Sequence, residues 1–148
     1  MKKILLLLLI SGSFFCQAQT FGFVIDHQAL VVKNLEKEAD FYANILQLKE
    51  ITSTETKATR RWFDINGSAL HLIKNETVSI NKDKSQHLCL STQDLEGFIK
   101  ILEKNHIAYE DWAGTKNSIT HRKDGVLQIY IQDPEGYWLE INTAQHIK

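Results

Sequence analysis

Hydrophobic and polar residues follow two different periods along this chain. Alternation along residues 27–32, 63–73, 87–91 and 130–141 predicts strands whose side chains point to opposite faces in turn. After Asn34 and again after Asp94, apolar residues recur every three or four positions, which predicts two amphipathic helices with these residues as N-caps. The apolar stripes consist of Leu35, Phe41, Ile45, Leu46 and Leu48 in the first helix and of Leu95, Phe98, Ile101 and Leu102 in the second.

This order of elements occurs twice because the chain contains an internal repeat. At an offset of 60, HQALVVKNLEKEADFYANIL from His27 falls on HLCLSTQDLEGFIKILEKNH from His87, and five of the first ten positions agree, one of them Asn on Asp. At an offset of 69, FDINGSALHLI falls on YIQDPEGYWLEI once one turn residue is inserted. Each copy therefore predicts a β-α-β-β-β module that ends in a hairpin, at Asn66-Gly67 or at Pro134-Glu135-Gly136.

Four polar side chains occupy equivalent positions in the strands of the two copies. The leucine-rich face of each strand should pack on the helices, and the opposite face carries His27, His71, His87 and Glu140. Pseudo-twofold packing of the modules would bring these four residues toward one centre. A carboxylate in an apolar strand is costly unless it is paired, hydrogen-bonded or bound to a metal, and imidazoles with a carboxylate most often surround a divalent ion. The pattern therefore predicts a mononuclear metal site.

Paired modules with DHQALVVKNLEKEADFYANIL at one end and GVLQIYIQDPEGYWLEI at the other resemble the vicinal oxygen chelate superfamily, which includes glyoxalase I, bleomycin-resistance proteins, fosfomycin-resistance enzymes and extradiol dioxygenases. The resemblance covers about residues 23–143 and implies an α+β fold, in which the modules form a half-open, barrel-like mixed sheet around a central cavity. It implies a divalent metal (Zn, Ni, Mn, Fe or Co) held by His27, His71, His87 and Glu140. Glyoxalase I usually carries Glu at the position of His71, so it is left open whether His71 is a ligand.

The resemblance further implies a metal-dependent, glyoxalase-like lyase or isomerase that acts on a small oxygenated substrate chelated through vicinal oxygens. Glu140 is the expected general base, because a carboxylate beside a chelated carbonyl can take a proton from the adjacent carbon, and His71 is the alternative. Two other functions stay open. One is metal-free binding and sequestration of a small molecule, as in bleomycin-resistance proteins, and the other is an Fe(II) dioxygenase.

Three residues outside the ligand set are expected to contact the substrate. Arg122, in the polar loop 110–126, is suited to hold an anionic group, although a solvated charge before the Asp124-Gly125 turn is the alternative. Trp62 and Trp138 are expected to form part of the cavity wall. Cys89 lies two residues from His87 on the same face and is interpreted as a small cavity-lining residue rather than a ligand or nucleophile.

Length and the N-terminal pattern bound the organisation of the chain. The 148 residues, 43% hydrophobic and 24% charged, fit one globular domain. Residues 1–18 have the pattern of a cleaved signal peptide, with two lysines, an apolar run too short to span a bilayer and small residues before the cut; a retained anchor is the alternative. We therefore expect an exported, periplasmic or secreted protein with a single domain at 19–148, in which module one (about 23–74), a linker (75–86) and module two (about 87–143) follow one another.

Charge and cysteine content exclude other classes of partner. Without residues 1–18 the chain carries 15 basic and 18 acidic residues, a formal net charge of −3, so nothing basic is left to attract a nucleic-acid backbone. Only Cys89 then remains, and no internal disulfide can form. We expect a small-molecule substrate, no nucleic acid and no membrane association after removal of the signal peptide, and a homodimer is left open.

Overall fold

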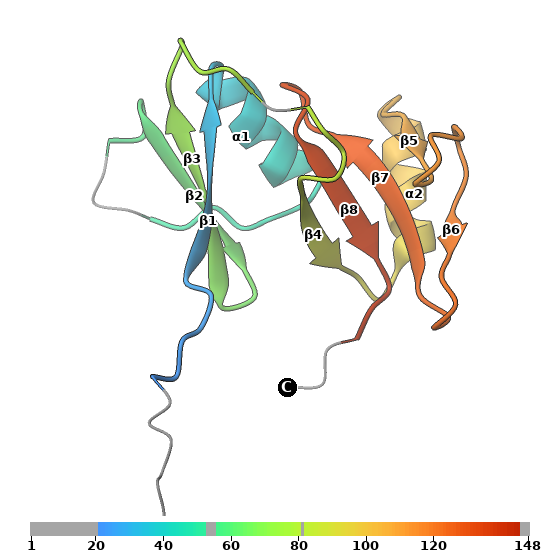
Figure 1. Cartoon of the computed structure of the whole chain (residues 1–148). Helices are drawn as coiled ribbons and strands as arrows, with labels where there is room; N and C mark the ends of the chain where they lie inside the picture. Colours follow the sequence, from blue (N-terminus) through green and yellow to red (C-terminus); the bar gives the residue numbers. More distant parts are fainter. Residues whose placement is uncertain (1–20, 53–55, 81, 146–148) are drawn as a thin grey trace, which may run out of the picture.

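The computed structural model describes residues 21–52, 56–80 and 82–145. The predicted signal peptide at residues 1–18 lies outside these residues, so its prediction is untested. Among the helices of the described ranges, none is long and apolar enough to cross a membrane. The remaining elements follow one another in the predicted order, strand then helix then strands, twice along the chain (Figure 1).

Module one is built from β1 (His27–Val32), α1 (Leu35–Asn44), β2 (Arg60–Ile65) and β3 (Ser68–Lys74). The sheet order is β1-β3-β2, with β1 parallel to β3 and β2 antiparallel to it. The predicted hairpin joins β2 to β3 at Asn66 and Gly67, whose φ values of 47° and 97° are those of a tight two-residue turn.

One strand predicted for module one is reduced to a single bridge. Among the described residues between α1 and β2, pairing with the sheet is limited to the bridge where Glu50 meets Phe63, flanked by two backbone hydrogen bonds. The sequence that follows, TSTETK at residues 52–57, offers no apolar side chain to bury against a sheet. The prediction of a full β-α-β-β-β unit was therefore wrong for this strand.

Module two contains β4 (His87–Ser91), α2 (Leu95–Lys104), β5 (Tyr109–Glu110), β6 (Thr120–His121), β7 (Leu127–Gln132) and β8 (Trp138–Asn142). Its sheet has the order β4-β8-β7-β5, and β6 pairs with β7. The parallel pairing of β4 with β8 repeats that of β1 with β3, as the sequence repeat predicts. The two-residue strand β6 lies inside the polar loop and was not predicted.

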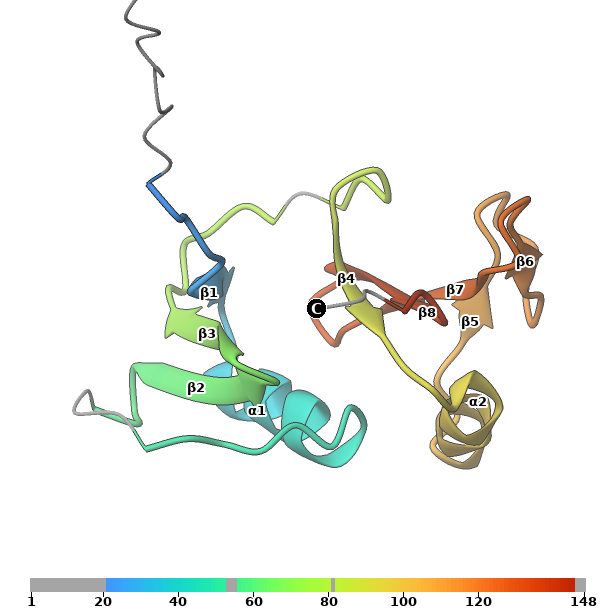
Figure 2. The same cartoon turned by 90° about the horizontal axis from the view of Figure 1, so that it is seen from below.

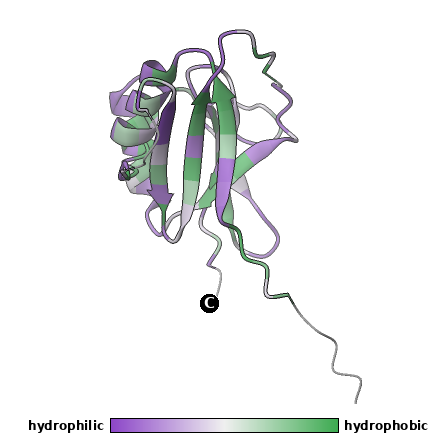
Figure 3. Cartoon of the chain, turned by 90° about the vertical axis from the view of Figure 1, so that its left-hand side faces the viewer, coloured by the Kyte–Doolittle hydropathy of each residue, from purple (hydrophilic) through white to green (hydrophobic). Residues whose placement is uncertain are grey.

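Both helices begin where the sequence predicts. The side chain of Asn34 accepts a hydrogen bond from the Lys37 amide, and that of Asp94 accepts one from the Gly97 amide. The leucine-rich faces of the strands form the core with the helices, and its fully buried members include Leu70, Leu72, Leu102, Ile129 and Leu139. Apolar positions along the strands are interrupted by single polar ones, as Figure 3 shows. Two mixed sheets that are not closed into a barrel confirm the predicted half-open α+β fold.

Each sheet is covered by a helix on one side only. Seen nearly along the strands, α1 lies on one face of the first sheet and α2 on one face of the second, and the two helix-free faces do not face each other (Figure 2). The modules are joined where the β7–β8 hairpin meets the end of β1: the Tyr137 hydroxyl donates to the Val31 carbonyl at 2.8 Å, and Glu135 Oε1 accepts from the amides of Lys33 and Asn34 at 2.6 Å.

Candidate metal centre

Glu140 lies on the helix-free face of module two and is fixed by two donors. Its Oε2 accepts a hydrogen bond from the Tyr130 hydroxyl at 2.6 Å, and its Oε1 accepts one from Asn142 Nδ2 at 2.7 Å. Tyr130 is directly opposite Glu140 in the antiparallel pairing of β7 with β8, and Gln128 donates to the Tyr130 hydroxyl at 2.9 Å. The buried carboxylate that the sequence singled out is therefore hydrogen-bonded on both oxygens.

These contacts determine the charge of Glu140. Burial alone would raise the pKa of its carboxyl, but the hydrogen bonds from Tyr130, Asn142 and Cys89, together with the charge of His87, outweigh burial and leave the pKa below its ordinary value. An ionised carboxylate with a lowered pKa is a good ligand for a cation. It is a weak proton acceptor, because its conjugate acid is destabilised by the same donors.

His87 presents one ring nitrogen to Glu140. Its Nδ1 lies 2.8 Å from the Lys84 carbonyl oxygen, which can only accept, so Nδ1 carries the hydrogen. Its Nε2 lies 3.3 Å from Glu140 Oε2. Two ligands of a tetrahedral ion, each at about 2.0–2.1 Å, are about 3.3–3.4 Å apart, so this separation fits a shared metal.

The helix-free face of module one carries a cluster of three rings. The indole of Trp62 is stacked on the imidazole of His71 with ring centres 3.7 Å apart. His27 meets both rings edge-on, at 5.2 Å from Trp62 and 5.9 Å from His71, and its Nδ1 lies 2.6 Å from Asp26 Oδ2. His71 is buried, whereas His27 is exposed at the start of β1.

The four predicted ligands therefore lie in two pairs, His27 with His71 and His87 with Glu140. Among residues 21–52, 56–80 and 82–145 of one chain, no three His, Cys, Asp or Glu side chains are close enough to hold a metal ion. The expected convergence on one centre does not occur within the described chain, because the two helix-free faces do not face each other (Figure 2). The assignment of the four residues as ligands stays a prediction.

The predicted substrate-contacting residues are divided in the same way. Trp62 belongs to module one, whereas Trp138 and Arg122 belong to module two. The Trp138 indole donates to the Lys82 carbonyl at 2.9 Å. Arg122 pairs with Asp124 Oδ2 at 2.6 Å, and both side chains are exposed at the turn that its alternative interpretation predicted.

A cavity of about 470 Å³ lies along the gap between β1 and β4, next to His87. Ala29 and Val31 line one wall, and Cys89 and Trp138 line the other. Burial, together with the neighbouring Glu140 carboxylate, raises the pKa of the Cys89 thiol to about 12. A thiol that stays protonated is a poor nucleophile, which agrees with its interpretation as a cavity-lining residue.

Sequence reasoning did not identify Tyr130 and Lys84 as residues that contact the ligand pair of module two. Tyr130 could have been found, because a hairpin centred on Glu135 places it directly across from Glu140. Lys84, whose carbonyl orients His87, lies in the linker, where no periodic pattern predicts a contact.

Comparison with known proteins agrees with this arrangement of elements. The profile of the Glyoxalase/Bleomycin resistance protein/Dioxygenase superfamily matches residues 24–141. The metallothiol transferase FosB of Staphylococcus haemolyticus is 26% identical over 124 residues, covering 81% of this chain and 83% of that protein.

Solved structures share the fold at lower identity. A glyoxalase/dioxygenase from Nostoc punctiforme superposes with a TM-score of 0.69 at 20% identity, covering 88% of this chain and 98% of that one. Lactoylglutathione lyase from Agrobacterium tumefaciens superposes with a TM-score of 0.63 at 17% identity, covering 82% and 93% of the two chains. At these identities the similarity establishes the fold and leaves the reaction undetermined.

Proposed function

Because the chain belongs to the Glyoxalase/Bleomycin resistance protein/Dioxygenase superfamily, we propose that it is a metal-dependent enzyme acting on a small oxygen-bearing molecule. One observation carries the proposal. His87 Nε2 and Glu140 Oε2 lie 3.3 Å apart, and Nδ1 of His87 is already committed to the Lys84 carbonyl. When His87 is neutral, its Nε2 directs a lone pair, and not a hydrogen, toward the ionised carboxylate, and a cation between them would satisfy both groups.

The donor set suits the metals that the family implies. Imidazole and carboxylate ligands without thiolate accept Zn, Ni, Mn, Fe or Co. An ion bound by His87 and Glu140 would supply a Lewis acid that polarises an oxygen of the substrate. Two ligands leave the coordination incomplete, so the remaining protein ligands must come from elsewhere.

We propose that His27 completes the site from a second copy of the chain. The pair on module one lies on a helix-free face that does not meet the pair on module two of the same chain. In a twofold-symmetric dimer, the module-one face of each chain can lie on the module-two face of its partner, because one contact generates the other by symmetry. Such a dimer would contain two equivalent sites, each bringing His27 and His71 of one chain to His87 and Glu140 of the other.

The state of Glu140 favours its predicted role as a metal ligand over its predicted role as general base. A carboxylate with a lowered pKa and donors on both oxygens is better suited to hold the ion than to take a proton from carbon. For a lyase or isomerase reaction, the proton acceptor would then be His71, supplied by the other half of the same composite site.

Because the ionised Glu140 carboxylate is a weak base, a second candidate function is a group-transfer reaction that needs no proton abstraction from carbon. The similarity to metallothiol transferases makes a thiol the natural second reactant. In such an addition the sulfur forms a bond to carbon, a carbon–oxygen bond breaks, and the proton of the thiol ends on the released oxygen. Parallel assays of thiol consumption and of isomerisation, with a panel of epoxides and α-ketoaldehydes, would distinguish the two reactions.

A complementation experiment tests the shared site. His27→Ala and His87→Ala, each as a homodimer, should lose most of their bound metal. A purified heterodimer of the two variants should recover one ion per dimer, because one of its two sites combines His27 and His87 from the chains in which they are intact. Metal content per dimer, measured by elemental analysis, is the readout, with heterodimers selected through two different affinity tags.

Three results would contradict the proposal. A wild-type protein that binds none of the five metals would leave His87 and Glu140 as an ordinary ion pair. A heterodimer as metal-poor as its parents would place the complete site within one chain. A wild-type chain that stays monomeric while it binds metal would exclude sharing between copies.

A further inference from the structure

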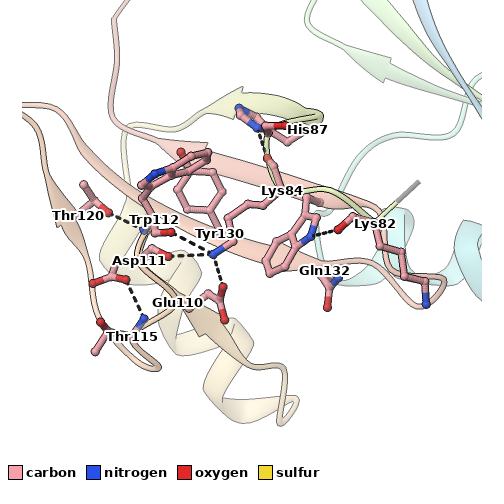
Figure 4. A network of polar contacts seen from close by, with 12 residues as sticks. Lys82, Lys84, His87, Glu110, Asp111, Trp112, Thr115, Thr120, Tyr130 and Gln132 are labelled. Carbon is pink, nitrogen blue, oxygen red and sulfur yellow. Dashed lines mark hydrogen bonds and ion pairs between the residues drawn. The ribbon is translucent and has the colours of Figure 1, made fainter. Parts of the chain in front are cut away.

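Lys84 lies in the linker three residues before His87, and its ammonium group is held by the polar loop. Its Nζ forms an ion pair with Glu110 and donates to the carbonyl oxygens of Asp111 at 3.2 Å and Trp112 at 3.4 Å (Figure 4). The side chain is only 17% exposed. We call these contacts between Lys84 and residues 110–112 the Lys84 clasp.

The same ammonium group contacts two rings beside the candidate metal centre. Its Nζ lies 4.6 Å from the centre of the Trp138 ring and 5.4 Å from that of the Tyr130 ring, both within the range of cation–π attraction. Tyr130 in turn donates its hydroxyl hydrogen to Glu140. The clasp therefore contacts the group that fixes one of the two candidate ligands of module two.

The backbone of Lys84 fixes the other ligand. Its carbonyl oxygen accepts the hydrogen of His87 Nδ1 at 2.8 Å, which leaves Nε2 as the nitrogen that faces Glu140. The tautomer and orientation of a metal-binding histidine are set by the hydrogen bond of its other nitrogen. The position of this single carbonyl thus decides which nitrogen of His87 is available.

No sheet holds that carbonyl in place. The described residues of the linker, 75–80 and 82–86, contain no helix or strand, so side-chain contacts replace the ladder hydrogen bonds that fix a strand. A loop held in this way can shift once its main side-chain contact is removed.

We infer that Lys84 is a positioning residue of the metal centre, whose clasp to Glu110 holds the linker carbonyl that orients His87. The inference rests on the proposed function in that it assigns His87 to a metal. Its structural part, the control of the His87 tautomer, can be tested in the protein without metal.

The test compares Lys84→Met with Lys82→Met. Methionine keeps most of the apolar stem of lysine and removes the ammonium group. Lys82 lies in the same linker, but its side chain lies against Gly136 instead of Glu110, so Lys82→Met removes the same charge and leaves the clasp intact. Glu110→Gln removes the ion pair, the charged contact of the clasp, from the opposite side without changing the linker.

The first readout is the pair of imidazole ¹⁵N shifts of His87 in metal-free protein at about pH 9, well above the ordinary titration range of imidazole. Wild type and Lys82→Met should show a hydrogen on Nδ1 and a bare Nε2. Lys84→Met and Glu110→Gln should show a mixture of the two tautomers. The second readout is metal affinity by competition with a chelator, which we expect to fall about tenfold in both clasp variants and to stay unchanged in Lys82→Met.

The outcomes separate this inference from the proposed function. A His87 that keeps its hydrogen on Nδ1 in folded Lys84→Met and Glu110→Gln would overturn the inference even if the protein binds metal. A tautomer change in both clasp variants would support it even if no metal binds. If Lys84→Met fails to fold, the result for Glu110→Gln decides alone. A loss of metal affinity in Lys82→Met equal to that in Lys84→Met would overturn the inference, because it would show that only the charge of the linker matters.

Discussion

Replacing Glu38 by glutamine should stabilise the protein increasingly as the pH rises. Glu38 lies in α1 with no exposed surface, and neither of its side-chain oxygens makes a well-formed hydrogen bond with a donor among the described residues, the Glu135 amide contributing least to its pKa. Its neighbour Asp133 is well supplied: Oδ1 accepts from three backbone amides of the β7–β8 hairpin, and Oδ2 accepts from the Tyr42 hydroxyl. Of the two carboxyl groups, Asp133 is therefore the one that is ionised and Glu38 is the one that is protonated.

The proton on Glu38 makes the stability of the protein depend on pH. Burial and the charge of Asp133 raise the pKa of Glu38 from 4.5 to about 9, so the folded chain keeps a proton that the unfolded chain releases above 4.5. This contribution is fully present below 4.5 and is lost between 4.5 and about 9, because folding must then take up a proton. The slope is about −1.4 kcal/mol per pH unit, which amounts to a loss of about 3 kcal/mol at about pH 7.

Glutamine removes this dependence and keeps a donor. Its amide can donate to Asp133 without taking up a proton, so the variant should have no slope from this site. The stability difference between Glu38→Gln and wild type should grow by as much as about 1.4 kcal/mol for each pH unit between about pH 5 and pH 8. Any constant offset from imperfect amide geometry leaves this growth unchanged.

Urea denaturation of metal-free protein at several pH values measures the difference. The control is Glu36→Gln in the same helix, an exposed glutamate that pairs with Arg61, and its difference from wild type should not change over this pH range. A difference for Glu38→Gln that is independent of pH would refute the reasoning, because it would mean that Glu38 is ionised in the folded protein.

Four further predictions concern the metal centre, a turn and export. Tyr130→Phe should lower metal affinity about tenfold without unfolding the chain, because Glu140 loses one of its two donors; unchanged affinity in a chelator competition would contradict this. In the same assay His71→Ala should cost less affinity than His87→Ala, and an equal loss would make His71 a full ligand. Gly67→Ala should destabilise the protein by about 1 kcal/mol in urea, since Gly67 has a φ of +97° with open space around it; no loss would mean that the turn relaxes. The intact mass of the exported protein should lack the first eighteen residues, and a chain that starts at Met1 would exclude cleavage.

Local pattern was sufficient to predict most of the secondary structure. The caps at Asn34 and Asp94 and the turn at Asn66-Gly67 were found because each depends on interactions within a few residues. The third strand expected for module one is reduced to a bridge at Glu50, because the polar sequence beyond it cannot bury a face on the sheet.

The repeat identified four equivalent residues but could not say how they meet. Equivalent positions imply equivalent faces, and the structure places His71 and Glu140 on the helix-free faces as expected. Whether two such faces meet within a chain or between chains depends on how the modules pack, and strand periodicity carries no information about that packing. The role of Lys84 could not be predicted for a related reason, since a linker side chain can reach a loop 26 residues away only after module two has folded.

The junction between the modules shows how side-chain size breaks the symmetry that the repeat predicts. Tyr137 of the β7–β8 hairpin reaches Val31, and in the aligned copies these positions correspond to Ser68 of the β2–β3 hairpin and to Ser91. Ser68 is too short to reach the carbonyl of Ser91 as Tyr137 reaches that of Val31, and both serines line a cavity of about 520 Å³. The first junction also encloses the Glu38–Asp133 pair, so it becomes weaker as the pH rises. At alkaline pH the modules should therefore loosen first where the β7–β8 hairpin meets α1, which is the contact that holds module one beside the strand carrying Glu140.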